Sequence, residues 1–161
     1  MTYDKSPILI CDPSPHMANI IAGMARTLGL RNIFEAYDMR AARSALSLRR
    51  FGLVLLNDYL GKDDTIALLR ALRADPDHIN RTVSVIMMSS APDKDLIAAA
   101  RDAGVNEFLR KPFAVNHLQS RLTALEAHPR TFIVSESYCG PDRRRRTEAF
   151  DGEDRRHANP G

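Results

Sequence analysis

Short apolar runs alternate with amphipathic stretches over the first 127 residues, and this alternation constrains the fold more than any other feature of the chain. A short apolar run bounded by polar residues is typical of a strand buried on both faces. The stretches between the runs carry apolar residues at helical spacing. Strict alternation predicts an α/β fold with a five-stranded parallel sheet, right-handed crossovers and helices on both faces. The expected strands are 7–11, 32–36, 53–56, 83–88 and 105–109, and the expected helices are about 15–28, 38–50, 64–74, 92–103 and 115–127.

The composition is that of one folded domain followed by a different segment. Of the 161 residues, 44% are hydrophobic and 27% are charged, so a single domain with a sizeable core is expected. The two cysteines, Cys11 and Cys139, make no disulfide framework. The chain has no signal-peptide pattern and no run near the roughly 18 apolar residues of a membrane span. We therefore expect a cytoplasmic, monomeric protein without membrane insertion, with a domain at 1–128 and a tail at 129–161.

Polar side chains stand where four of the expected strands end. These are Asp12, Asn57, Ser89 and Lys111. In an open parallel sheet, ligands bind beyond the carboxyl ends of the strands, so these four side chains are expected to converge on one cleft.

Residues 6–127 resemble a response-regulator receiver domain of the single-domain, CheY-like chemotaxis type. The resemblance implies a flavodoxin-like (βα)5 fold and a role in two-component signal transduction, chemotaxis and motility. It also implies that a phosphoryl group is taken from a phosphohistidine onto an aspartate at the end of the third strand. The matching segments are 8–12 (ILICD), 53–57 (LVLLN), 85–90 (VIMMSS), 100–104 (ARDAG) and 104–113 (GVNEFLRKPF).

The pocket departs from the family pattern at two positions. Pro13 replaces the second acid of the pair that holds Mg²⁺ in the family, and Asn57 stands at the phosphoacceptor position. Mg²⁺ prefers carboxylate oxygens, and an amide is a far weaker nucleophile than a carboxylate. We therefore expect no metal, no cofactor, no catalytic residue and no enzymatic activity, with Asn57 hydrogen-bonded to Lys111 and Asp12. Asp58 would reach the pocket only through a one-residue slip of its strand, which would turn every side chain to the other face.

The tail has few aliphatic residues after Val134 and is rich in charge, glycine and proline, which predicts disorder in the free protein. Residues 131–134 are left with two alternatives, docking on the domain or forming a short strand. Residues 130–161 hold seven arginines, six acids and no lysine, and Gly-x-Asp-Arg-Arg occurs at both 140–144 and 152–156.

Arginine without lysine indicates recognition of a planar ligand, because the guanidinium pairs bidentately with phosphate or with guanine and stacks on bases. Carboxylates complement it by accepting from guanine N1 and N2. The stretch YCGPDRRRR at 138–146 resembles the arginine-rich segment of the Cle proteins, CheY-like cyclic di-GMP effectors of alphaproteobacteria that act at the flagellar motor. The resemblance implies that cyclic di-GMP binds and orders the tail. The expected ligand-binding residues are Tyr138, Asp142, Arg143, Arg144, Arg145, Arg146, Asp151, Asp154, Arg155 and Arg156.

The resemblances together imply a cyclic di-GMP effector whose tail changes how the receiver meets a partner, the flagellar motor switch. The family's usual docking face corresponds to about 93–125 here. One alternative is a pseudo-receiver that acts by protein contacts alone, independently of nucleotide and phosphorylation. Another is nucleic-acid binding, which the six acids of the tail oppose, so no DNA partner is expected. The last is a phosphoryl-accepting switch that uses Asp58.

Overall fold

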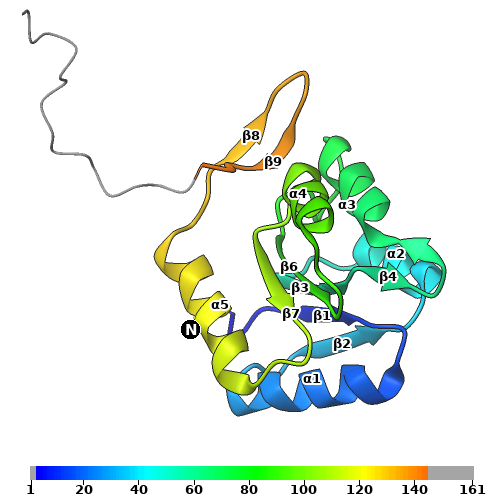
Figure 1. Ribbon diagram of the computed structural model, residues 1–161, viewed down its shortest axis with the longest axis vertical. Coiled ribbons are helices and arrows are strands. Elements are labelled where there is room, and N and C mark those ends of the chain that lie inside the picture. Colours follow the sequence, from blue (N-terminus) through cyan, green and yellow to red (C-terminus); the bar gives the residue numbers. More distant parts are fainter. Residues whose placement is uncertain (1–2, 145–161) are drawn as a thin grey trace, which may run out of the picture.

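The structure is a computed structural model that describes residues 3–144. Its centre is a five-stranded parallel sheet in the order β2-β1-β3-β6-β7 (Figure 1). The order places β1, β3 and β6 between neighbours, and β2 and β7 at the two edges. The five expected strands are present, and their boundaries differ from expectation by at most two residues. The strands are β1 (Ile8–Cys11), β2 (Ile33–Ala36), β3 (Leu53–Asn57), β6 (Ser84–Ser89) and β7 (Glu107–Arg110).

Helices cover both faces of the sheet, which confirms the predicted flavodoxin-like receiver fold. Helices α1 and α5 pack on one face, and α2, α3 and α4 pack on the other (Figure 1). Each face buries its own aliphatic cluster, since alternate residues of a strand point to opposite sides. None of the helices in the described part of the chain is long and apolar enough to span a membrane. The helices are α1 (Pro15–Thr27), α2 (Met39–Leu48), α3 (Thr65–Ala74), α4 (Lys94–Ala103) and α5 (Val115–Ala127).

Short polar side chains set where four of the helices begin. Each accepts a hydrogen bond from a backbone N–H of the first turn, which would otherwise have no partner. Helix α4 begins two residues later than the sequence predicts, because Asp93 is the capping residue and Pro92 therefore precedes the helix. The capping residues are Ser14 for α1, Asp38 for α2, Asp64 for α3 and Asp93 for α4.

The chain forms two small antiparallel hairpins outside the sheet. One joins β4 (Tyr59–Leu60) to β5 (Asp63–Asp64) directly after β3. The other joins β8 (Phe132–Val134) to β9 (Cys139–Pro141) and follows α5. The prediction of disorder from residue 129 is therefore wrong for the described part of the tail. Of the two alternatives for 131–134, both hold: the segment forms a strand, and its hairpin packs on the domain beside α3 and α4 (Figure 1).

A buried arginine explains why the hairpin docks. Arg73, only 1% exposed, donates to the Gly104 carbonyl oxygen at 2.8 Å and to the Arg81 carbonyl oxygen at 2.6 Å. Its guanidinium lies 5.7 Å from the centre of the Phe132 ring, and that of Arg81 lies 5.4 Å from the same centre. Two cations against one aromatic ring favour docking of β8. Burial lowers the pKa of Arg73 to about 10, so the group remains charged at neutral pH.

Gly104 and Gly140 lie against each other where the hairpin meets the domain. A Cβ atom on Gly140 would lie 3.0 Å from the Gly104 Cα and 2.7 Å from the Tyr138 hydroxyl oxygen. Gly104 also ends α4 with a φ of 102°, a conformation that glycine adopts most readily. The docked position of the hairpin therefore depends on glycine at both positions.

Candidate functional site

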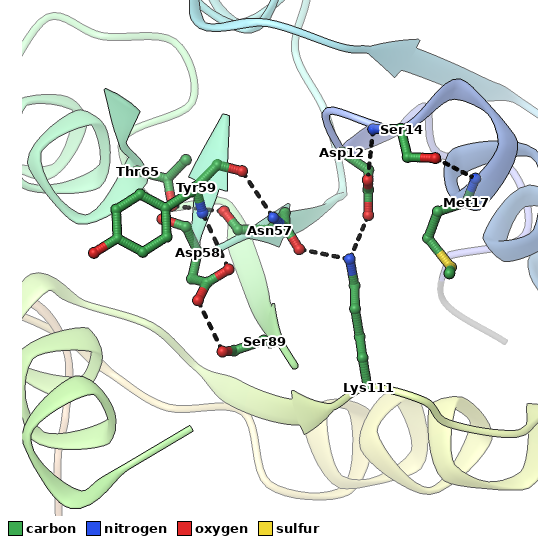
Figure 2. Close-up of polar contacts among 9 residues, drawn as sticks. All are labelled: Asp12, Ser14, Met17, Asn57, Asp58, Tyr59, Thr65, Ser89 and Lys111. Atoms are coloured by element: carbon green, nitrogen blue, oxygen red, sulfur yellow. Dashed lines mark hydrogen bonds and ion pairs between the residues drawn. The ribbon is translucent and has the colours of Figure 1, made fainter. Parts of the chain in front are cut away.

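The strand-end pocket is formed by the residues at the carboxyl edge of the sheet. Asp12 directly follows β1, Asn57 ends β3, Ser89 ends β6 and Lys111 directly follows β7. Their arrangement confirms that parallel strands bring these four residues to one edge (Figure 2). Asp12 is 1% exposed, Asn57 8% and Ser89 0%.

Lys111 occupies the centre of the pocket and links the two residues on either side of it. Its Nζ lies 2.5 Å from Asp12 Oδ2 and 2.6 Å from Asn57 Oδ1 (Figure 2). The predicted contact between Lys111 and Asn57 is confirmed. A direct hydrogen bond from Asn57 to Asp12 is not formed, because the Asn57 Nδ2 donates instead to the Tyr59 carbonyl oxygen at 2.7 Å.

Asp58 reaches the pocket without a slip of β3, contrary to prediction. The register pairs Asn57 with Met88, so the strand is in its expected alignment. After Asn57 the chain turns into β4, and the Asp58 carboxylate accepts a hydrogen bond from Ser89 Oγ at 2.8 Å (Figure 2). Thr65 holds this turn, because its Oγ1 donates to the Asn57 and Asp58 carbonyl oxygens. A threonine opening the helix after the strand is the signal that could have indicated the turn.

The donor set of the pocket does not fit Mg²⁺. This ion needs a near-octahedral set of hard oxygens, usually with two carboxylates and several waters. Pro13 contributes no ligand atom, and both oxygens of Asp12 are engaged, one by Lys111 and the other by the Ser14 backbone N–H at 2.9 Å. The described residues contain no group of three metal-binding side chains. The pocket holds an internal cation, the Lys111 ammonium, where a metal would need free oxygens.

Cys11 lies next to the pocket and is inert in the folded protein. Its side chain is 0% exposed, and burial together with the charge of Asp12 raises the pKa of the thiol from 9.0 to about 12. Since the thiolate is the reactive form, this cysteine is not a nucleophile at neutral pH.

Tyr138 forms part of the hairpin core in this structure. Its hydroxyl donates to the Pro141 carbonyl oxygen at 2.5 Å, and the residue is 9% exposed. Burial raises the pKa of the Tyr138 hydroxyl, so it stays protonated as this bond requires. The Arg143 guanidinium covers the ring, 4.4 Å from its centre. A role in stacking on a nucleotide remains a prediction, and it would require the Arg143 side chain to move.

The first arginine of the predicted ligand site is anchored on the domain. Arg143 Nη1 lies 2.6 Å from Asp102 Oδ1 on α4, and both side chains are about half exposed, at 45% and 55%. Asp142 Oδ1 accepts a hydrogen bond from the Arg144 backbone N–H at 2.9 Å, and Arg144 is exposed. The remaining predicted ligand residues lie outside the described residues: Arg145, Arg146, Asp151, Asp154, Arg155 and Arg156.

Comparison with known proteins gives a consistent picture of the first 123 residues. Residues 8–123 match the model of the response regulator receiver domain. The chain is 33% identical over 115 residues to the chemotaxis protein CheY of Pseudomonas aeruginosa, covering 71% of this chain and 91% of that protein. It is 31% identical over 115 residues to chemotaxis protein CheY-3 of Vibrio cholerae, covering 71% and 87%.

A solved structure supports the same fold. The receiver domain of sensor histidine kinase PA1611 from Pseudomonas aeruginosa PAO1 aligns with a TM-score of 0.65 and 27% identity, covering 76% of this chain and 98% of that one. That structure has a magnesium ion coordinated in its active site cleft. The family match ends at residue 123, so the hairpin and the arginines that follow it lie beyond the matched region.

Proposed function

Because its match over residues 8–123 makes this chain a member of the response regulator receiver family, we propose that it is a non-enzymatic receiver controlled by cyclic di-GMP. The chain is a CheY-like receiver of signal transduction, and its relatives are named chemotaxis proteins. In the proposed function the arginines of the tail capture the dinucleotide. The bound tail then changes how the receiver meets its protein partner, for which a flagellar motor switch protein is the candidate.

The observation that carries the proposal is the closed state of the strand-end pocket. Lys111 is already paired with Asp12 and Asn57, and the amide at position 57 offers no nucleophilic oxygen for a stable acyl phosphate. The PA1611 receiver, in contrast, holds magnesium in the corresponding cleft. A receiver with an amide at the family's acceptor position, and with both Asp12 oxygens already engaged, would respond to a signal through a different input.

The arginines of the tail supply the candidate input. Arg143 and Arg144 are exposed and follow Asp142 after the end of β9, and Arg143 is paired with Asp102 on α4. Arginine pairs with phosphate and guanine through two parallel hydrogen bonds, and it stacks on bases through its flat face. Cyclic di-GMP offers both phosphates and guanines.

The position of the hairpin suits control of a partner surface. The surface at about 93–125 comprises α4, β7 and α5, and it is the proposed docking face for the protein partner. Arg143 contacts Asp102 on α4, and Arg130 lies 3.8 Å from Glu107 on β7. A ligand that binds the arginines would thus alter charge and contacts at the edge of this face.

Titration calorimetry with cyclic di-GMP tests the proposal. The full chain is expected to bind, and Arg143→Ala/Arg144→Ala is expected to weaken binding by about a hundredfold, since each charged hydrogen-bonding group contributes about 1.5–3 kcal/mol. The matched control is Arg40→Ala/Arg43→Ala, which removes the same charge from exposed positions on α2. Cyclic di-AMP controls for guanine recognition. Equal loss in both double variants, or no binding by the full chain, would exclude the proposed function.

One observation favours a second function, a pseudo-receiver that acts by protein contacts alone. The hairpin is already docked, with Tyr138 hydrogen-bonded to Pro141 and Arg143 paired with Asp102. In that case the tail is a structural part of the docking face and needs no ligand. Partner binding that is the same with and without cyclic di-GMP would support this second function.

A further inference from the structure

A pocket of about 380 Å³ lies between α4 and α5, and it is separate from the strand-end pocket. The domain contributes Arg101 on α4 and Arg121 on α5 to its lining. The tail contributes Arg130 before the hairpin and Arg143 after it. We call it the arginine pocket. Its volume falls within the range of small-molecule sites, about 300–1,000 Å³.

The charge of the arginine pocket is unbalanced. Four arginines line it, and Glu107 is the one acid among the lining residues, while Arg143 is also paired with Asp102 on α4, 2.6 Å away. Glu107 lies 3.9 Å from Arg121 and 3.8 Å from Arg130, which is too far for a hydrogen bond. These guanidinium groups therefore keep N–H donors that can bind an anion. Arg121 is 44% exposed, so a ligand in solution can reach it.

Apolar side chains also line the pocket. They include Phe108, Val105 and Ile97 on α4, and Ile97 has 39% of its surface exposed. An anion such as inorganic phosphate would make no use of these side chains. A flat, partly apolar group joined to a phosphate would use both the apolar side chains and the arginines, and a nucleobase on its sugar-phosphate fits that description.

We propose that the arginine pocket is the part of the cyclic di-GMP site contributed by the receiver domain, and that it holds one phosphate and the adjoining guanine. The inference rests on the proposed function and adds residues that the tail motif does not contain, Arg101, Arg121 and Arg130. Arg143 belongs to both parts, because it lines the pocket and opens the arginine run.

The location links ligand binding to the partner surface. Most residues that line the pocket belong to the surface at 93–125, and Arg130 and Arg143 belong to the tail. A bound dinucleotide would neutralise Arg101 and Arg121 and would cover Phe108. The ligand thus changes the docking face directly, and no structural change has to travel through the sheet.

The test is titration calorimetry of the full chain with cyclic di-GMP, repeated for Arg101→Ala and Arg121→Ala. Each variant is expected to bind about tenfold more weakly, because it loses charged hydrogen bonds to phosphate. Arg121→Lys keeps the charge but loses the bidentate geometry, so its affinity should lie between wild type and Arg121→Ala. Arg43→Ala, exposed on α2, removes one positive charge far from the pocket and is expected to bind like wild type. Melting temperatures check that every variant is folded.

The outcomes separate the two proposals. If the full chain binds and the Arg101 and Arg121 variants match the Arg43 control, the arginine pocket is overturned and the proposed function stands. If the full chain does not bind cyclic di-GMP, both are overturned. If weakening appears in the pocket variants alone, the pocket is part of the site, and amide resonances of 97–108 should shift on titration.

Discussion

Two regions of this receiver carry clustered charge. They differ in whether the charged groups are already paired within the protein. At the strand-end pocket, Lys111 contacts Asp12 and Asn57, and Asp58 accepts from Ser89. At the arginine pocket, Arg143 pairs with Asp102, whereas Arg121 and Arg130 lie beyond hydrogen-bond distance of Glu107. The first region pairs its charged groups within the protein, whereas Arg121 and Arg130 of the second keep N–H donors for a ligand.

The two regions also differ in how far their ion pairs are exposed to solvent. Lys111 and Asp12 are 12% and 2% exposed, whereas Arg143 and Asp102 are 45% and 55% exposed. A buried pair cannot be broken without leaving a charge in a low dielectric, while an exposed pair exchanges easily with water or a ligand. In this chain, therefore, the ion pair at the carboxyl edge of the sheet is buried, whereas the ion pair at the arginine pocket is exposed.

Lys111→Met should produce the largest effect on stability. It leaves the Asp12 carboxylate buried without its cation, so we expect a loss of about 3 kcal/mol in the free energy of unfolding, measured by urea denaturation. Arg143→Ala is the matched change at the exposed pair and should cost less than about 1 kcal/mol. Similar losses in the two variants would contradict the contrast between the regions.

Gly104→Ala tests how firmly the hairpin is built into the domain. The φ of 102° costs alanine about 1–2 kcal/mol, and its Cβ would also lie 3.0 Å from Arg73 Nε and 3.1 Å from Arg73 Cγ. Gly29→Ala is the control, because Gly29 has a φ of 91° and open space around its Cβ position. We expect Gly104→Ala to lose about 1 kcal/mol more than Gly29→Ala by thermal or urea unfolding, since Arg73 must shift. Equal losses of stability in the two variants would show that the Arg73 side chain moves away from the added Cβ at little cost in free energy.

The stability of the folded protein should also depend on pH through Cys11, which lies next to the strand-end pocket. Its pKa is raised from 9.0 to about 12 in the folded protein, so above pH 9 the unfolded chain loses this proton while the folded chain keeps it. The contribution to stability is therefore complete below pH 9 and declines as the pH rises toward 12. At pH 10 we expect wild type to have lost about 1 kcal/mol more than Cys11→Ala, each relative to its own stability at pH 8. Parallel pH profiles for the two proteins would contradict this burial effect.

Asp102→Asn should have the smallest effect on stability and a measurable effect on binding. The exposed pair with Arg143 contributes only about 0.2–1 kcal/mol, so folding should barely change. The same pair competes with a ligand for Arg143. Its removal should therefore raise the affinity for cyclic di-GMP by about two- to fivefold, measured by calorimetry. A weaker affinity in this variant would mean that Asp102 positions Arg143 for the ligand.

The sheet, the helices and the strand-end cluster were predictable because they depend on local pattern and simple topology. Alternating apolar runs define β1, β3 and β6, and parallel strands must bring Asn57 and Lys111 to one edge. Asp58 was missed because its position depends on the turn into β4, which is held by Thr65 eight residues after Asn57. Strand periodicity carries no information about that turn.

The tail was predicted least well, because its order comes from distant residues. Composition alone predicts disorder for a segment such as 132–141. Composition contains no information about the surface that Arg73 and Gly104 provide for this segment in the folded protein. The arginine pocket was missed for the same reason. Arg101 and Arg121 are ordinary exposed residues of two helices, and only the fold brings them beside Arg130 and Arg143.

In the proposed function, the input signal enters through the arginines and not through the strand-end pocket. The most direct measurement is calorimetry with cyclic di-GMP on two variants in parallel, Asp58→Asn and Arg143→Ala/Arg144→Ala. Asp58→Asn removes the carboxylate that contacts Ser89 and should bind within about twofold of wild type, while the arginine variant should lose about a hundredfold. The opposite pattern, or phosphorylation of wild type by acetyl phosphate that Asp58→Asn abolishes, would contradict the account.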